Sequence, residues 1–215
     1  MAHNYVEYWE RCWQEDNAST DLYQYLEGFY GLKSNEIELF KEHGVKNVCD
    51  AACGFGAYTV ALASNGFSVD SFDISETSVE ITKNALKKYG WDASRVKVAG
   101  ILNTGYGDVM FDAVVAHAVI DHLTYDDAGK ALTELNRIVK RNGLILVSFD
   151  MAHEDDYNEP HVSLPDGTME YTCESLKGML FHPYDWAGID ELLKDRNVIY
   201  KADKGDRERV VILKA

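Results

Sequence analysis

Short continuous apolar runs alternate along this chain with stretches whose apolar residues recur at helical spacing. The runs at 45–51, 67–74, 95–101 and 144–150 predict strands, and FDAVVAHAVI at 111–120 predicts a strand followed by a loop. The runs LILVSF and DAVVA stay apolar rather than alternating, which is typical of strands covered on both faces. Strands that alternate with helical patterns predict an α/β fold in which a parallel sheet carries helices on both faces.

Turn and cap residues mark the ends of the helices that are predicted between these runs. The first predicted helix runs from Ala57 to Asn65 and is closed by Gly66. The second runs from Ser75 to Gly90, and the third from Thr124 to Asn142-Gly143. The third helix has an apolar stripe that continues to Val139, and Thr124 with Asp127 resembles a capping arrangement. Each of these helices lies between two predicted strands, as a β-α repeat requires.

The chain before the first strand predicts a separate helical unit. Its patterns indicate helices near 20–31 and 34–43, the second of them capped by Ser34. We therefore expect a helical cap or lid over residues 1–44 and one further domain over residues 45–215.

The last third of the chain departs from the β-α repeat. Residues 151–180 are polar, contain prolines and predict a substrate-side insertion with short strands rather than another repeat. DWAGIDELLKD at 185–195 predicts an amphipathic helix. The remaining residues predict a closing antiparallel hairpin that turns around Gly205-Asp206.

Charge and cysteine usage narrow the classes of partner. The formal net charge is −15, and the 21 basic residues form no cluster of the kind that binds phosphate backbones. We therefore expect neither nucleic acid nor a membrane as partner, and no stretch has the roughly 20 apolar residues that span a bilayer. The four cysteines are scattered and the N-terminus has no apolar leader pattern, which predicts a cytoplasmic protein with reduced thiols.

A glycine turn between two acids is the most informative chemical pattern. Asp50 ends the first predicted strand, Gly54 and Gly56 follow it, and Asp73 ends the second predicted strand. Such a turn lets a ligand approach the backbone at a helix N-terminus, although a tight turn without any ligand is equally compatible. A dinucleotide site is a weaker match, since its G-x-G-x-x-G/A fingerprint would meet Thr59 at the third position.

The two acids indicate which ligand the turn would hold. Asp73 lies 19 residues after Gly54, where a carboxylate can accept hydrogen bonds from both hydroxyls of a ribose. Asp50 is placed to offset an ammonium group, directly or through water. The pair describes a ligand with a cationic end and a ribose but no required phosphate.

These residues resemble the S-adenosylmethionine-binding motif of class I methyltransferases. The family pattern D-x-(G/A)-C-G-x-G is matched by DAACGFG at 50–56, and DIS at 73–75 is similar to its second motif. FDAVVAHAVIDHL at 111–123 resembles the fourth-strand motif, and 132–149 resembles the helix, "LKPGG" turn and strand that follow. The resemblance covers about residues 45–150 and implies a seven-stranded, mostly parallel sheet with a C-terminal antiparallel hairpin.

The resemblance also implies a cofactor and the residues that bind it. The cofactor is S-adenosylmethionine and the product S-adenosylhomocysteine. The implied cofactor-binding residues are Asp50, Ala51, Ala52, Cys53, Gly54, Gly56, Asp73, Ile74, Ile101, Leu102 and His117. Where many relatives carry a "GD" pair for the adenine, this chain has Gly100-Ile101. Leu102 is therefore expected to offer a backbone N–H and Ile101 to pack on the ring, with Asn103 as an alternative contact.

Three residues near the end of the fourth strand are the predicted catalytic residues. His117 is the first candidate for a general base, because that position opens toward the methyl group in this fold; the alternative is a histidine satisfied by a neighbouring loop. His122 and Asp121 follow it, with structural roles as their alternatives. No metal site is expected, since Asp126 and Asp127 beside them are better explained as first-turn helix acids.

The N-terminal aromatic residues are predicted to belong to a lid. One side of a predicted helix carries four aromatic residues, Tyr5, Tyr8, Trp9 and Trp13. This helix could pack on the core or at an oligomer interface. The alternative is a lid that closes over cofactor and substrate, with aromatic faces near the sulfonium. The predicted substrate or lid residues are Tyr5, Trp9, Trp13, Asp150 and His153.

The expected activity is methyl transfer from S-adenosylmethionine to a small-molecule acceptor, by a monomer or homodimer. The acidic stretch HEDDYNE would suit a cationic acceptor, although such loops are often only solvated. One alternative is a module that binds S-adenosylmethionine or its product without catalysis. The other is an NAD-dependent oxidoreductase, which Asp50 and Thr59 disfavour.

Overall fold

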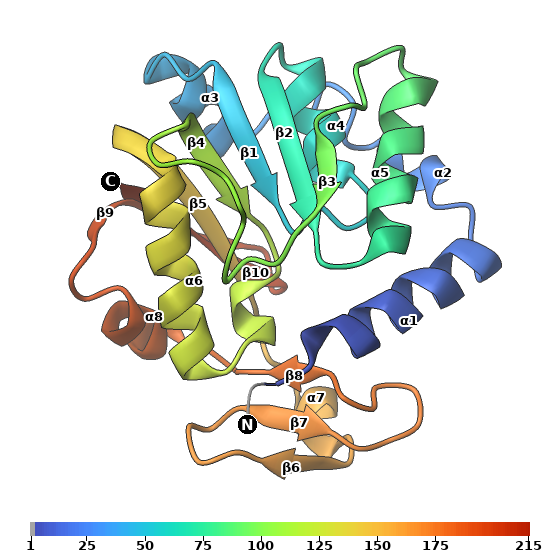
Figure 1. Cartoon of the computed structure of the whole chain (residues 1–215). Helices are drawn as coiled ribbons and strands as arrows, with labels where there is room; N and C mark the ends of the chain where they lie inside the picture. The colour runs from blue at the N-terminus through green and yellow to red at the C-terminus, as the bar shows by residue number, and fades with distance from the viewer. Residues whose placement is uncertain (1–2) are drawn as a thin grey trace.

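A seven-stranded sheet forms the centre of the computed structural model, which describes residues 3–215 (Figure 1). Its strand order is β3-β2-β1-β4-β5-β10-β9. The strands are β1 Asn47–Ala51, β2 Ser68–Asp73, β3 Val96–Val98, β4 Phe111–Ala116, β5 Val139–Asp150, β9 Asn197–Lys204 and β10 Glu208–Lys214. The first five are parallel, whereas β10 is antiparallel to both β5 and β9. The predicted fold class, including the closing hairpin, is confirmed.

Helices precede the first strand and connect the later ones, and local capping explains where several of these helices begin. They are α1 Tyr5–Ser19, α2 Tyr23–Leu26, α3 Asn35–Glu42, α4 Ala57–Ser64, α5 Glu76–Lys88, α6 Tyr125–Ile138 and α8 Trp186–Leu192, with a 3-10 turn η1 at Ile120–His122. The hydroxyls of Ser34, Ser75 and Thr124 each accept a hydrogen bond from a backbone N–H of the first turn that follows. These three predicted caps are confirmed.

Two predicted helix boundaries are wrong. The helix expected over 20–31 forms only as the single turn α2, and the neighbouring residues form turns. The helix expected to include Val139 ends at Ile138, because Val139 already pairs with Phe111 as the first residue of β5. Asn142, expected to stop a helix, instead has a φ of +63° in a register shift of that strand.

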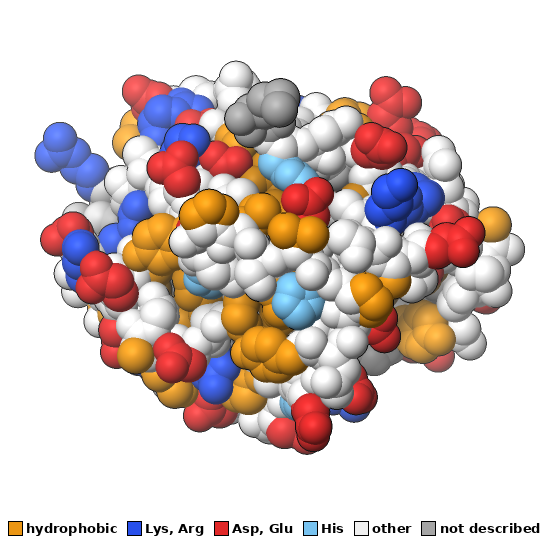
Figure 2. All heavy atoms as spheres, turned by 90° about the horizontal axis from the view of Figure 1, so that it is seen from below, with side chains coloured by type: hydrophobic (Ala, Val, Ile, Leu, Met, Phe, Trp, Pro, Cys, Tyr) orange, Lys and Arg blue, Asp and Glu red, His pale blue; other side chains and the backbone are white. Residues whose placement is uncertain are grey.

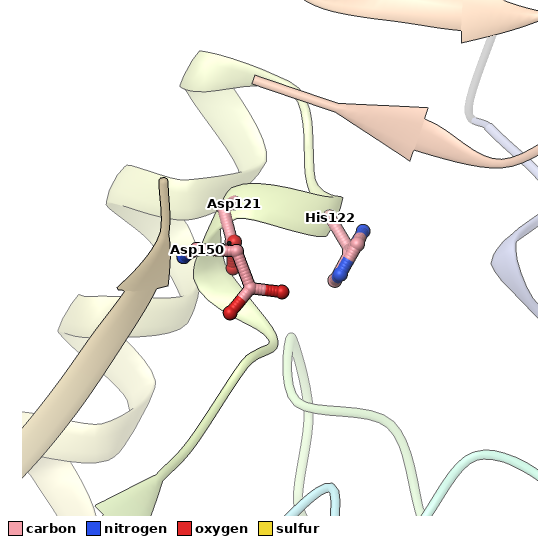
Figure 3. A group of neighbouring side chains, drawn as sticks. All are labelled: Asp121, His122 and Asp150. Carbon is pink, nitrogen blue, oxygen red and sulfur yellow. Dashed lines mark hydrogen bonds between the residues drawn. The ribbon is translucent and has the colours of Figure 1, made fainter. Parts of the chain in front are cut away.

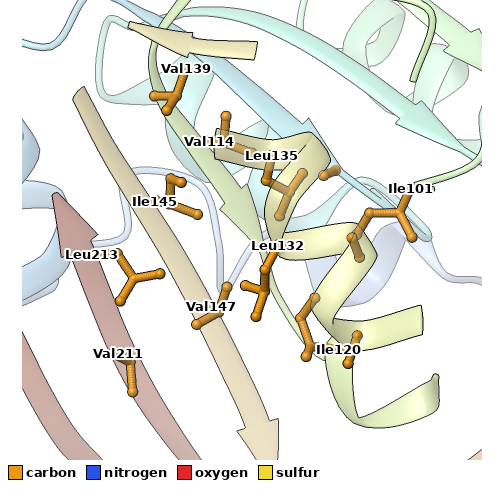
Figure 4. Packing of buried hydrophobic residues seen from close by; sticks show 14 of the residues in the cluster. Ile101, Val114, Ile120, Leu132, Leu135, Val139, Ile145, Val147, Val211 and Leu213 are labelled. Carbon is orange, nitrogen blue, oxygen red and sulfur yellow. The ribbon is translucent and has the colours of Figure 1, made fainter. Parts of the chain in front are cut away.

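Helices cover both faces of the sheet. On one face, α6 packs on β4, β5 and β10 through residues labelled in Figure 4, among them Leu132, Leu135, Val147 and Val211. Ile189 of α8 joins the same cluster. On the other face, α3 and α4 pack through Ile37, Phe40 and Leu62. Because the strand order reverses between β1 and β4, a crevice is expected at the carboxyl ends of these two strands.

A small second sheet lies beyond that carboxyl-terminal edge, beside α1 (Figure 1). It consists of β6 His161–Ser163, β7 Met169–Tyr171 and β8 Leu180–Phe181, preceded by the short helix α7 Glu154–Asn158. On the face seen in Figure 2, Lys and Arg side chains are scattered among acidic ones rather than gathered in one patch. Within residues 3–215, no helix combines the length and the apolar character needed to cross a membrane.

Candidate active site

A cavity of about 340 Å³ lies at the carboxyl ends of β1, β2 and β4. The glycine turn after β1, the end of β2, the loop after β3 and the loop after β4 form its walls, and α1 closes it. Ten of the predicted site residues line it: Tyr5, Trp9, Trp13, Ala52, Gly54, Asp73, Ile74, Ile101, Leu102 and His122. No Lys or Arg side chain of the described residues is among its walls, and Asp73 is its only carboxylate.

Asp73 joins the end of β2 to the glycine turn. Its side chain is buried, with Oδ2 accepting a hydrogen bond from the Gly54 N–H at 2.9 Å and Oδ1 accepting one from the Ser75 N–H at 3.0 Å. Burial raises the pKa of Asp73, and the two backbone N–H groups oppose that rise. The carboxylate therefore sets the shape of the turn and also faces the cavity.

The glycine turn needs glycine for both conformation and space. Gly54 has a φ of +54° and Gly56 one of +88°, in the left-handed region that disfavours side chains. A Cβ on Gly54 would lie 2.9 Å from the Cζ2 of Trp13, so the indole of α1 rests directly on this turn. The Cys53 side chain points into the core, where its Sγ lies 3.5 Å from the Oγ1 of Thr82.

Asp50 lies behind the turn rather than on the cavity wall. It is buried, and its Oδ2 accepts a hydrogen bond from the Thr59 hydroxyl at 2.6 Å; the same hydroxyl lies 2.8 Å from that of Ser71. Burial raises the pKa of Asp50 to about 6, although the Thr59 bond and the nearby His117 lower it. Thr59, noted in the sequence only as a departure from the dinucleotide fingerprint, thus holds this acid.

Apolar side chains from two loops form the end of the cavity beyond Asp73. Ile74 follows β2, and Ile101 and Leu102 follow β3, where Gly100 and Asn103 form an isolated antiparallel bridge. This tight turn brings Ile101, Leu102 and Asn103 to the same wall. The arrangement can hold a flat apolar ring without a side-chain carboxylate.

The N-terminal helix α1 is anchored over the cavity at two points. The Tyr5 hydroxyl donates a hydrogen bond to Asp127 Oδ2 at 2.8 Å, at the start of α6. At the start of α5, the Glu10 carboxylate accepts hydrogen bonds from the hydroxyls of Ser75 at 2.6 Å and Thr77 at 2.5 Å. Glu10 was not singled out from the sequence, because its role depends on partners 65 and 67 residues away.

We expect the Glu10→Ala substitution to loosen α1. Burial raises the pKa of Glu10, but the bonds from Ser75 and Thr77 outweigh it and lower that pKa to about 2. Because the pKa of Glu10 in the folded chain lies below its ordinary value of 4.5, the anchor is complete above pH 4.5. It is lost only as the pH falls toward 2. At pH 7 the variant should show faster amide hydrogen exchange in α1 but unchanged exchange in the central strands. Glu7→Ala, on the same helix, is the control, and equal exchange in α1 of both variants would contradict the anchor.

His117 lies outside the cavity wall. Its Nε2 is 2.8 Å from Oε2 of Glu208 on β10, and its ring lies 4.3 Å from that of Tyr58 on α4. The adjacent residues Ala118 and Val119 line the cavity instead. The structure therefore separates His117 from the other two predicted catalytic residues.

Asp121 and Asp150 lie next to His122, the one residue of the three that lines the cavity (Figure 3). Oδ2 of Asp121 accepts a hydrogen bond from the Asp150 N–H at 2.8 Å. The ring of His122 meets that of Trp9 edge-on at 5.0 Å. Burial and the neighbouring Asp150 carboxylate raise the pKa of Asp121 above its ordinary value, and His122 opposes that rise.

The remaining acids and histidines singled out in the sequence lie elsewhere. Asp126 and Asp127 both pair with Lys130 on α6. His153 is exposed at the start of α7, where its N–H donates to Asp156, and it does not line the cavity.

Comparison with known proteins adds the following similarities. Residues 49–147 match a family model described as a methyltransferase domain. Glycine/sarcosine N-methyltransferase from Aphanothece halophytica is 29% identical over 173 residues, which cover 66% of this chain and 62% of that protein. The crystal structure of the PH0226 protein from Pyrococcus horikoshii OT3 is 20% identical, with a TM-score of 0.73 over 98% of this chain and 99% of its own. Magnesium protoporphyrin IX methyltransferase from Synechocystis PCC 6803, with bound SAH, is 16% identical, with a TM-score of 0.61 over 100% of this chain and 89% of its own.

These similarities confirm the predicted resemblance to class I methyltransferases. The matched segment begins within β1 and ends within β5, so it contains the glycine turn, Asp73 and the η1 turn. The solved structures share the fold over nearly the whole chain, whereas this chain spans 62% of the length of the glycine/sarcosine N-methyltransferase.

Proposed function

We propose that this chain, which has the class I methyltransferase fold and carries a methyltransferase domain over residues 49–147, transfers a methyl group from S-adenosylmethionine to a small molecule. One observation carries the proposal: a cavity at the carboxyl ends of β1, β2 and β4 has aromatic and aliphatic walls, one carboxylate and no Lys or Arg among the described residues. Such a cavity suits a nucleoside with a positive charge and disfavours one with a pyrophosphate.

The walls match the parts of that cofactor. Asp73 would accept hydrogen bonds from the ribose hydroxyls, and Ile74 with Ile101 would hold the adenine between apolar side chains. The faces of Trp9 and Trp13 would lie near the cationic sulfonium, since aromatic faces attract cations. The volume of about 340 Å³ lies at the small end of ligand-binding cavities, so the cofactor would fill most of it and the acceptor would bind at its edge, near His122.

The sulfonium supplies an already activated methyl group, so the chain's own residues chiefly align the acceptor and exclude water. Good alignment can contribute roughly 7–11 kcal/mol of the barrier reduction. In the transfer, the acceptor's lone pair forms a bond to the methyl carbon, and the carbon–sulfur electron pair stays on sulfur. The proton that the acceptor loses leaves to a nearby base or to water. Trp9 and Tyr5 on α1 would exclude bulk water from this step.

A small acceptor is supported by charge and by the relative. The net charge of −15 opposes binding to nucleic acid, and the name of the Aphanothece halophytica relative specifies glycine and sarcosine as acceptors of that protein. Two carboxylates near the acceptor end, Asp121 and Asp150, favour an acceptor that is neutral or cationic over an anionic one.

A module that binds the cofactor without catalysis is the second candidate. It is favoured by the position of His117, since the first predicted base is paired with Glu208 and does not line the cavity.

Titration calorimetry followed by a transfer assay tests the proposal. We expect the full chain to bind S-adenosylmethionine and S-adenosylhomocysteine and not to bind NAD. Incubation with methyl-labelled cofactor and a panel of amines, alcohols and thiols should then yield a labelled product. Absence of binding at millimolar cofactor would refute the cofactor assignment, whereas binding without transfer to any acceptor would favour the module.

A further inference from the structure

Three potential metal ligands converge from two elements beside the cavity (Figure 3). Asp121 and His122 belong to the η1 turn, and Asp150 is the last residue of β5. One ligand atom from each lies within 4.8 Å of the others. Two carboxylates with an imidazole are a donor set for divalent first-row metals, since imidazole suits zinc, iron and nickel and carboxylate suits manganese.

Asp121 supplies an independent sign of a missing partner. Its side chain is 0% exposed, and Oδ2 is occupied by the Asp150 N–H. Oδ1 is buried without a hydrogen-bond partner among residues 3–215. A buried carboxylate oxygen without a partner lowers the stability of the fold unless a cation or a hydrogen-bond donor satisfies it. The ion pairs of the described residues include none with Asp121 or Asp150, so Lys and Arg do not meet that need.

His122 is oriented as a metal ligand would be. Its Nδ1 lies 2.9 Å from the carbonyl oxygen of Leu180 on β8, and a carbonyl can only accept, so Nδ1 carries the hydrogen. The neutral ring then has its lone pair on Nε2. Metal-binding histidines usually hold their second nitrogen in this way, which fixes both the tautomer and the ring orientation.

We propose that Asp121, His122 and Asp150 bind one divalent transition-metal ion at the wall of the cofactor cavity. The mixed oxygen and nitrogen donors favour a metal such as Mn²⁺, Fe²⁺ or Zn²⁺ over Mg²⁺ and Ca²⁺, which prefer oxygen donors alone. Three protein ligands leave further coordination positions open toward the cavity, because His122 lines it and Asp150 is partly exposed. Binding of the metal does not depend on the proposed function.

A role for this metal follows if the methyl-transfer proposal also holds. An acceptor oxygen or nitrogen could occupy an open coordination position. There the metal would lower the pKa of the acceptor and hold it in place, as metals do with bound water. The reactive atom would then lie beside Trp9 and His122, and His122 is one of the predicted catalytic residues.

Titration of the metal-free full chain with Mn²⁺ tests the site. Electron paramagnetic resonance of free Mn²⁺ and calorimetry should both report one ion bound per chain. Asp150→Asn is the main variant, because this residue is partly exposed and ends a strand, and its affinity for Mn²⁺ should fall by at least about tenfold. His122→Gln should behave alike. Asp155→Asn, an exposed acid of α7, is the matched control and should bind Mn²⁺ as the wild type does.

Binding of S-adenosylhomocysteine by the same samples separates the two proposals. Wild-type protein that binds this compound but no Mn²⁺ at millimolar concentration would overturn the metal site and leave the proposed function standing. Equal Mn²⁺ affinity in the wild type, Asp150→Asn and His122→Gln would also overturn it. A protonated amine would be the favoured occupant if simple amines, but not Mn²⁺, bound in an Asp150-dependent way.

Discussion

Replacement of Asp73 by alanine is expected to weaken cofactor binding at least about tenfold and to lower the free energy of unfolding. The carboxylate accepts hydrogen bonds from the N–H groups of Gly54 and Ser75, and each such bond to a charged group contributes about 1.5–3 kcal/mol. Its loss leaves the glycine turn without its support and, under the proposed function, the ribose of the cofactor without its acceptor. Titration calorimetry with S-adenosylhomocysteine and urea unfolding measure the two effects.

Asp70→Ala is the matched control for this variant. Asp70 lies on the same strand β2 but pairs with Arg95 and does not line the cavity. We expect its substitution to affect stability modestly and to leave cofactor affinity unchanged. If Asp73→Ala bound the cofactor as tightly as Asp70→Ala, the ribose assignment would be wrong.

The Gly54→Val substitution is expected to abolish detectable cofactor binding while the protein still folds. A branched side chain there adopts a φ of +54°, which costs roughly 1–2 kcal/mol for an ordinary residue. Its Cβ would also approach the Cζ2 of Trp13 to 2.9 Å, so α1 must shift off the turn. Circular dichroism tests the fold, and calorimetry tests binding.

Gly44→Val separates backbone strain from loss of the site. Gly44 has a φ of +69°, and an added Cβ meets nothing within 4 Å, so the backbone strain is similar and the steric collision is absent. This control should lose stability but keep normal cofactor affinity. Comparable binding by Gly54→Val would show that the turn serves only the fold.

Local patterns were enough to predict most of the fold. The apolar runs that became β1, β4 and residues 144–149 of β5 are buried on both faces, whereas only the second half of β2 is buried. The caps at Ser34, Ser75 and Thr124 involve residues only three positions apart. One of the two wrong boundaries has a non-local cause. The start of β5 at Val139 depends on pairing with Phe111, which no window of sequence around residue 139 contains.

Part of the candidate site could also be predicted from the sequence, and part of it could not. Gly54 and Asp73 were predicted from the motif and its spacing, and Ile74, Ile101 and Leu102 from the resemblance to class I methyltransferases; all five line the cavity. Their positions follow from where parallel strands end, which the order of strands along the chain already implies.

Which side chains face the cavity was decided by contacts between distant parts of the chain. His117 turns toward Glu208, which the closing hairpin places on the far side of β5 and within reach of the loop after β4, and Asp50 is held by Thr59 in the core. The sequence by itself determined the sheet, the glycine turn and the acid that supports it, because these depend on short-range periodicity, caps and backbone conformation. Only the tertiary structure brought Asp150 to Asp121 and His122 and tied Glu10 to α5, because side-chain direction at strand and helix ends depends on long-range packing.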